Sequence, residues 1–205
     1  MYIWFFLSLL GFTVTLPLYY LSLEHLKLEE KYGRRKGKKI GDISGVISGW
    51  GFFLFWFGIW FSPQTRFTIP TFQELLVRLP VLNITIPLLH LVVFTPFFAV
   101  GAWFGIRGVI ETTLKVAETH RPARVVTTGV YSIVRHPQYL GGLFAHIGFS
   151  FLLSALYSLL ATLIVALIYF ISRKEEDELA SEFGEEYVGY KKKVPMLLPR
   201  WREPW

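Results

Sequence analysis

The sequence predicts an all-α fold: an integral membrane helical bundle with five transmembrane helices, the last two a tight hairpin, and a cytosolic C-terminal helix. Three observations predict this class. Hydrophobic residues make up 53% of the 205 positions, long apolar runs recur along the chain, and basic residues gather between those runs. A soluble domain of this size contains about 45–50% apolar residues even with glycine counted. We therefore expect lipid to surround most of the chain.

Three apolar runs are long enough to cross a membrane. A hydrocarbon layer about 30 Å thick requires roughly 20 helical residues. Residues 2–23, 43–61 and 81–106 meet this requirement. No basic segment precedes the first run, and no cleavage site of small residues follows it. We therefore expect a retained span and not a signal peptide.

A fourth apolar block covers residues 138–172 and contains no charged side chain over 35 positions. This length is too great for one membrane helix and suits two short ones. We expect a turn near Ser154, with helices over residues 137–153 and 155–171. Each helix is only just long enough to cross.

The basic residues predict the orientation in the membrane. Residues 24–42, 107–136 and 173–205 contain seven, five and seven of them, whereas residues 62–80 contain two. Because lysine and arginine accumulate in cytosolic loops, we expect an outside N-terminus and a cytosolic C-terminus. The same rule accounts for the net charge of +6, so we expect membrane lipid and no nucleic acid as a partner.

The numbers and positions of cysteine and glycine limit the possible functions and the packing of the helices. The absence of cysteine excludes disulfides, thiolate metal sites and cysteine nucleophiles, and we expect no metal site. Glycines at positions 41, 45 and 49, and again at 101 and 105, allow helices to approach closely in lipid. We expect this packing to occur within one chain, as a monomer.

Residues 127–141 form the most informative stretch, which reads as a loop that enters a helix. Gly129 permits a turn, and Pro137 suits the first helical position, where its missing N–H costs nothing. Unpaired N–H groups at the helix start favour an anionic ligand.

One face of this helix carries two imidazoles and a phenol: His136, Tyr139 or Leu140, Leu143 and His146. Such a face is more often structural than catalytic. His90 lies near the middle of the third apolar run, where an imidazole is costly. It either lines a substrate tunnel or is hydrogen-bonded to a neighbouring helix, and the sequence leaves both open.

A charged helix is expected over residues 174–193. Acidic residues at its start and lysines at its end fit the helix dipole, which is the structural explanation. Spacings of four, four and three place four residues on one apolar stripe: Leu179, Phe183, Tyr187 and Tyr190. Tyr169, Arg173 and Glu176 share a different face, which can hold a polar ligand where lipid meets water.

Taken in order, these residues resemble the isoprenylcysteine carboxyl methyltransferase family, part of a wider group that includes phospholipid N-methyltransferases. The resemblance covers about 75 residues, 125–199, whereas residues 1–123 match only as a set of spans. It rests on six strings: Val-Thr-Thr-Gly-Val-Tyr at 126–131, Arg-His-Pro-Gln-Tyr-Leu-Gly at 135–141, the pair Glu175 and Glu176, Phe-Gly-Glu-Glu-Tyr at 183–187, Tyr-Lys-Lys-Lys-Val-Pro at 190–195, and Leu-Pro at 198–199. We expect one domain over 1–205: three spans and loops over 1–123, and a cofactor-binding loop, hairpin and catalytic segment over 124–205.

The resemblance implies an S-adenosyl-L-methionine-dependent methyltransferase that acts at the cytosolic membrane face on a lipophilic small molecule or a prenylated cysteine. Carried over by position, the expected cofactor-binding residues are Thr128, Gly129, Tyr131, His136, Tyr139, Leu140, and Glu175 or Glu176. The expected catalytic residues are Tyr139, Arg173 and Lys193. Family members carry arginine where this chain has Lys193. The lysine ammonium is a single charge, whereas an arginine guanidinium can donate two parallel hydrogen bonds to one carboxylate.

Several functions stay open at this point. Carboxyl methylation of an isoprenylcysteine-type substrate needs no general base, because a carboxylate is ionised at neutral pH. Phospholipid N-methylation would require a proton to leave the amine, and His136, His146 or Tyr139 can relay it. A non-enzymatic membrane protein and a membrane reductase are the remaining alternatives.

Overall fold

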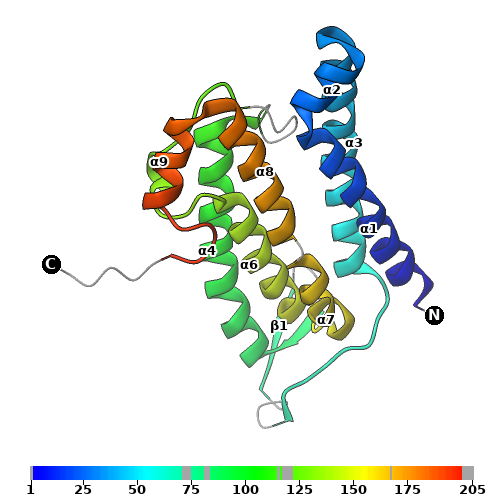
Figure 1. Ribbon diagram of the computed structural model, residues 1–205. Helices are drawn as coiled ribbons and strands as arrows, with labels where there is room; N and C mark the ends of the chain where they lie inside the picture. The colour runs from blue at the N-terminus through cyan, green and yellow to red at the C-terminus, as the bar shows by residue number, and fades with distance from the viewer. Residues whose placement is uncertain are drawn as a thin grey trace, which may run out of the picture.

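The computed structural model describes residues 2–70, 75–80, 84–114, 116, 122–166 and 168–199, and this part is mostly helical (Figure 1). Among the basic residues that predicted the orientation, Lys115, Arg121, Arg200 and Arg202 lie outside the described residues, as do residues 81–83 and the side chain of Tyr169. The elements in chain order are α1 (Ile3–Leu23), α2 (His25–Tyr32), α3 (Arg34–Phe61), β1 (Leu76–Leu79), β2 (Ile84–Pro87), α4 (Leu88–Thr112), the 3-10 helix η2 (Gly129–Ser132), α6 (Pro137–Leu152), α7 (Leu156–Val165), α8 (Ile168–Phe183) and α9 (Glu185–Lys193).

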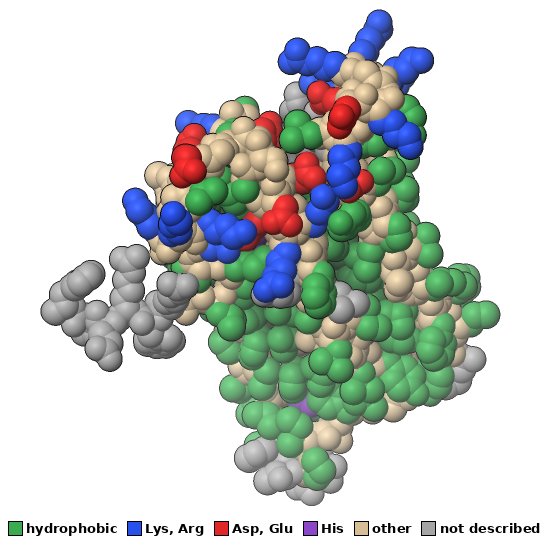
Figure 2. Space-filling model, viewed as in Figure 1, with side chains coloured by type: hydrophobic (Ala, Val, Ile, Leu, Met, Phe, Trp, Pro, Cys, Tyr) green, Lys and Arg blue, Asp and Glu red, His purple; other side chains and the backbone are tan. Residues whose placement is uncertain are grey.

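Four helical stretches of the described chain are long and apolar enough to cross a membrane: Ile3–Leu23, Arg34–Phe61, Leu88–Thr112 and Leu156–Phe183. Figure 2 shows hydrophobic side chains over most of the body and charged side chains gathered at one end. This distribution matches an integral membrane protein whose charged end projects from the lipid.

Two helices begin at other residues than the apolar runs predicted as spans. Helix α3 begins at Arg34, ahead of the run over residues 43–61, so five basic residues expected in a loop lie on its first turns. Helix α4 begins at Leu88 and not at residue 81. Hydrophobicity locates the apolar run but does not mark where the helix inside it begins.

The purely α-helical class also needs correction, because β1 and β2 form a two-stranded antiparallel sheet that pairs Leu76 with Pro87 and Leu79 with Ile84. The β-branched run Ile84-Thr85-Ile86 favours a strand. Pro87 then ends the strand and stands as the N-cap of α4, where its missing N–H leaves no bond unmade.

The predicted C-terminal helices are divided differently from the expectation. The helix expected over 155–171 is split into α7 and α8, and α8 continues to Phe183. The helix expected over 174–193 is broken at Gly184, whose φ of 56° favours glycine. The four-residue apolar stripe is therefore shared between α8 and α9, and only its tyrosines, Tyr187 and Tyr190, are buried.

Four of the long helices pack as two pairs, α1 with α3 and α4 with α6 (Figure 1). Within the second pair the glycines have the predicted packing role. A Cβ added to Gly101 would lie 2.8 Å from the carbonyl oxygen of Gly141, so the two backbones nearly touch. The backbone of Gly105 also lies at this close approach, because a Cβ added to Gly141 would lie 2.6 Å from the Gly105 nitrogen. A Cβ on Gly105 itself would meet open space, as would one on Gly49, and Gly49 therefore differs from the prediction.

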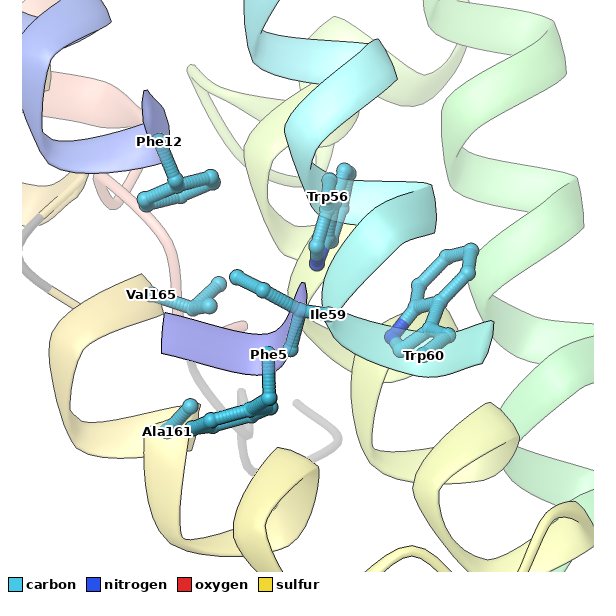
Figure 3. Packing of buried hydrophobic residues seen from close by; sticks show 7 residues of the cluster. All are labelled: Phe5, Phe12, Trp56, Ile59, Trp60, Ala161 and Val165. Carbon is cyan, nitrogen blue, oxygen red and sulfur yellow. The ribbon is translucent and has the colours of Figure 1, made fainter. Parts of the chain in front are cut away.

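A buried hydrophobic cluster connects the first helix pair to α7. Its seven side chains come from three helices and converge in Figure 3: Phe5 and Phe12 of α1, Trp56, Ile59 and Trp60 of α3, and Ala161 and Val165 of α7. Because lipid is as apolar as these side chains, close packing holds the cluster together more than water exclusion does. The cluster fixes α3 relative to the C-terminal half.

Candidate functional site

The loop before α6 and the segment after α9 lie side by side. The backbone N–H of Arg135 donates to the carbonyl of Pro195 at 2.9 Å, and that of His136 donates to Met196 at 3.1 Å. The tyrosine hydroxyl of Tyr190 donates to the carbonyl of Tyr131 at 2.6 Å. Segments about sixty residues apart in sequence are therefore joined at the charged end of the molecule.

Glu176 joins these segments to α8 through a buried cluster of charges. Its side chain is 2% exposed. One carboxylate oxygen accepts from Arg135 Nε at 2.6 Å and lies 3.2 Å from His136 Nε2, and the other lies 3.0 Å from Lys191 Nζ. Arg135 also donates to the carbonyls of Lys191 and Val194. Glu176 thus anchors the loop before α6 and helix α9 onto α8.

Glu175 has a different environment from its neighbour. Its carboxylate accepts a hydrogen bond from the hydroxyl of Tyr139 at 2.7 Å and is 21% exposed. It lines a polar cavity, which Glu176 does not. The sequence left the two glutamates equivalent, and the structure separates a cavity-lining carboxylate from an anchoring one.

The polar cavity has a volume of about 100 Å³ and lies between the loop over residues 122–126, the start of α6, α8 and α9. Tyr131, Tyr187 and Tyr190 contribute rings to its wall. Burial raises the pKa of Tyr131 to about 12 and raises the pKa of Tyr187 and of Tyr190 still further above the usual range. These phenols are therefore neutral at physiological pH and act as hydrogen-bond donors.

Glu111, a residue that the sequence reasoning missed, shapes the loop beside this cavity. Its two carboxylate oxygens accept from the N–H of Val130 at 3.2 and 3.1 Å. Gly129 has a φ of 56°, and a Cβ there would lie 2.0 Å from Glu111 Oε1. The available signal in the sequence was the acidic side chain of Glu111 near the end of a mostly apolar span.

Tyr139 connects the polar cavity to helix α1. Its ring stacks on that of His136 at a centroid distance of 5.3 Å and an interplanar angle of 4°. Its hydroxyl is hydrogen-bonded to the hydroxyl of Tyr19 and donates to Glu175. A phenol has one proton, so Tyr19 is the donor in the Tyr19–Tyr139 bond. No motif marked Tyr19, which is why the sequence reasoning missed it.

A second, apolar cavity of about 710 Å³ lies between α3, α4 and α6. Aromatic side chains of α3 form one wall, and Gly105 and Ile106 of α4 belong to another. The open space beside Gly49 and Gly105 belongs to this cavity. Three residues line both cavities, so these form a shared wall: Tyr19, Gln138 and Tyr139.

The comparisons with known proteins match the part of the chain that builds the polar cavity. The family model described as phospholipid methyltransferase matches residues 89–186. This stretch runs from helix α4 to the first residues of α9. Protein-S-isoprenylcysteine O-methyltransferase of Xenopus laevis is 44% identical over 77 residues, which cover 37% of this chain and 27% of the relative. These matches confirm the predicted family resemblance for this part of the chain.

Of two further relatives, one carries the same name and one a different name. The Protein-S-isoprenylcysteine O-methyltransferase of Homo sapiens is 38% identical over 85 residues, 40% of this chain and 29% of the relative. Methanethiol S-methyltransferase 1 of Bradyrhizobium diazoefficiens is 36% identical over 112 residues, 54% of this chain and 38% of the relative. The chain thus spans 27% to 38% of the length of these three relatives.

The structure brings together some of the expected site residues and not others. Of the expected cofactor-binding residues, four line the polar cavity: Tyr131, His136, Tyr139 and Glu175. Leu140 packs in a hydrophobic cluster beside it. Thr128 and Gly129 are exposed on the adjoining loop. Arg173 and Lys193 are exposed on α8 and α9 and line neither cavity.

Two other histidines of the matched stretch, His146 and His90, have structural partners. His146 Nδ1 accepts from the indole N–H groups of Trp56 and Trp60 at 2.8 and 2.9 Å, and its Nε2 lies 3.0 Å from the carbonyl of Ser158. The ring therefore carries its proton on Nε2. His90 Nδ1 lies 2.9 Å from Ser154 Oγ. Neither ring lines either cavity, and for His90 the hydrogen-bond alternative is the one observed.

Proposed function

We propose that this protein is an S-adenosyl-L-methionine-dependent methyltransferase that acts on a lipophilic substrate at the cytosolic membrane face. One observation carries the proposal: a polar cavity and an apolar cavity share the wall formed by Tyr19, Gln138 and Tyr139. A methyl transfer between a polar donor and a lipophilic acceptor requires two such cavities in contact. The family match over residues 89–186 supports this reading.

The residues of the polar cavity fit S-adenosyl-L-methionine. Glu175 presents a carboxylate that can accept from ribose hydroxyls or from the ammonium group. The rings of Tyr131, Tyr139, Tyr187 and Tyr190 offer stacking surfaces for adenine and a favourable environment for a cation. When bound, the cofactor supplies an electrophilic methyl group on a sulfonium.

The chain contributes positioning and water exclusion at the shared wall. In-line displacement requires the nucleophile about 3–3.5 Å from the methyl carbon, and holding that geometry supplies much of the rate enhancement. The apolar cavity can hold the lipophilic part of the acceptor, so that only its reactive atom reaches Tyr19, Gln138 and Tyr139. The apolar lining also keeps water from the reacting atoms.

The names of the relatives suggest different acceptors. The isoprenylcysteine-type relatives favour carboxyl methylation of a prenylated cysteine. The name of the family model favours a phospholipid acceptor. The methanethiol relatives are named for a thiol acceptor. All three acceptors are compatible with a shared wall between the two cavities.

The proposed function includes an arrangement of the chain in the membrane. We take residues 1–205 as a single unit with five spans, of which α6 and α7–α8 form a hairpin, and with an outside N-terminus and a cytosolic C-terminus. Membrane lipid surrounds the spans, the protein acts as a monomer, and no nucleic acid takes part. The charged end that holds the polar cavity then faces the cytosolic supply of cofactor.

Titration calorimetry of the purified full chain with S-adenosylhomocysteine tests the proposal. We expect one site per chain in the wild type and loss of that site in His136→Ala, because this ring stacks on Tyr139 and lines the polar cavity. Binding by neither protein would contradict the proposed function. Equal binding by both would remove His136 from the site.

A further inference from the structure

We propose that the methyl acceptor is a lipophilic thiol, and that Tyr19, Tyr139 and Glu175 carry its proton away. This inference rests on the proposed function and adds the chemical class of the acceptor. Tyr19 belongs to α1, which precedes the matched residues 89–186. Through Tyr19, the N-terminal helix of this chain takes part in the proposed proton transfer.

The lining of the apolar cavity disfavours an ionised acceptor. Among the residues that the structure describes, no Lys, Arg, Asp, Glu or His side chain lines this cavity. An ionised carboxylate moved into such surroundings without a partner loses several kcal/mol of solvation. A neutral thiol carries no such penalty.

Among the residues that the structure describes, the cations near the polar cavity are not placed to pair with an acceptor carboxylate at the shared wall. Arg135 is bonded to Glu176 and to two backbone carbonyls. Arg173 and Lys193 are exposed and line neither cavity, and Arg124 is exposed in the loop that borders the polar cavity. The carboxylate of Glu175 is hydrogen-bonded to Tyr139 of the wall and would repel an anionic acceptor.

The hydroxyl chain at the wall suits a nucleophile that carries a proton. Tyr19 donates to Tyr139, which donates to Glu175 at 2.7 Å. In the transfer, the acceptor S–H proton passes to Tyr19 oxygen, the Tyr19 proton passes to Tyr139, and the Tyr139 proton passes to the Glu175 carboxylate. The acceptor sulfur forms a bond to the methyl carbon as the bond from that carbon to the sulfonium sulfur breaks. The products are a methyl thioether, a neutral sulfide and one proton.

A thiol fits this relay better than an amine. The pKa of a free thiol is about 8.5, so it enters the cavity mostly neutral at pH 7, whereas an alkylamine near pKa 10 enters as a cation. The cation would have to lose both its solvation and its proton before reacting. A thiol needs only one proton moved, along a path that the structure already contains.

Three acceptors with the same alkyl chain separate the classes: dodecanethiol, dodecylamine and dodecanoate. The full chain in lipid nanodiscs receives each with S-adenosyl-L-methionine, and products are quantified by mass spectrometry. We expect dodecyl methyl sulfide to exceed the methylated amine and the methyl ester by about tenfold or more, the ratio that an unpaired polar group typically produces. Binding without cofactor, followed by fluorescence of Trp56 and Trp60 at the cavity wall, should favour the thiol over dodecanoate.

Tyr19→Phe tests the relay, with Tyr20→Phe as the matched control, since Tyr20 lies on the same helix, is exposed and lines neither cavity. We expect Tyr19→Phe to lower the thiol rate about 100-fold at pH 7, as loss of a general base does, with Tyr20→Phe near wild type. The deficit should shrink as the pH rises, because hydroxide then takes over part of the proton removal that Tyr19 supports at pH 7.

Preferred methylation of the amine or the carboxylate overturns the thiol assignment and leaves the proposed function intact. A Tyr19→Phe deficit that is equal at every pH overturns the relay. Methylation of none of the three overturns this inference, and the S-adenosylhomocysteine titration then shows whether the proposed function fails with it.

Discussion

The polar cavity and the apolar cavity meet at one wall but are built in opposite ways. The polar cavity is formed by short sequence strings around His136, Tyr139 and Glu175, in which each side chain has a specific hydrogen-bond partner. The apolar cavity is formed by helix faces of α3, α4 and α6, with two glycines that leave space. Under the proposed function, this comparison teaches that donor binding depends on individual polar contacts, whereas acceptor binding depends on volume.

The largest expected effect is on the anchor of the polar cavity. Glu176→Gln leaves the buried Arg135 without its carboxylate, and removal of one partner of a buried ion pair costs about 3–5 kcal/mol. We expect a clear fall in the thermal unfolding midpoint in detergent. Glu186→Gln, an exposed position on α9, is the control and should unfold as the wild type does. Equal midpoints for both variants would show that the cluster contributes nothing.

An intermediate effect is expected on the lining of the polar cavity. Glu175→Gln keeps the bond from Tyr139 but removes the charge, and a hydrogen bond to a charged group contributes about 1.5–3 kcal/mol. We expect S-adenosylhomocysteine to bind about 10- to 100-fold more weakly by calorimetry, with little change in unfolding. Asp177→Asn, exposed on the same helix, should bind normally. Tighter or unchanged binding in Glu175→Gln would assign cofactor recognition to other residues.

The smallest expected effect concerns the volume of the apolar cavity. Gly105→Leu adds a side chain where a Cβ meets open space, so it should fill the cavity without disturbing the helix packing. We expect long-chain acceptors to lose about tenfold in kcat/KM and short ones to lose little, since a few methylenes change the fit by that order. Val100→Leu lies on the same helix and lines neither cavity, so it should keep the wild-type chain-length profile. A uniform loss across all chain lengths would indicate a general disturbance.

The same contrast explains how much could be read from the sequence. The strings around His136 and Glu175 predicted that the loop before α6 and helix α8 meet, and the contacts of Arg135 and His136 with Glu176 confirm it. They did not separate Glu175 from Glu176, because adjacent helical residues differ by about 100° in direction and only the packed neighbours decide which one faces the cavity.

The apolar cavity could not be predicted from the sequence for a physical reason. Gly45, Gly49, Gly101 and Gly105 have the same spacing pattern, yet Gly101 touches another backbone and Gly105 faces open space. Tyr19 was one aromatic residue among many in an apolar run. The strand before α4 was missed because an apolar run of this kind has no period that separates strand from helix.

The contact between the two cavities is tested most directly by one ligand that occupies both. We suggest 5′-deoxyadenosine with a dodecylamino group at C5′, compared with its isomer that carries the same chain on N6 of adenine. The two compounds are equally lipophilic, so partition into detergent or lipid is matched. If the cavities meet at Tyr19, Gln138 and Tyr139, the C5′ compound should bind at least about tenfold more tightly by calorimetry, because its two halves bind as one ligand. Equal affinities for the two isomers would contradict a shared wall.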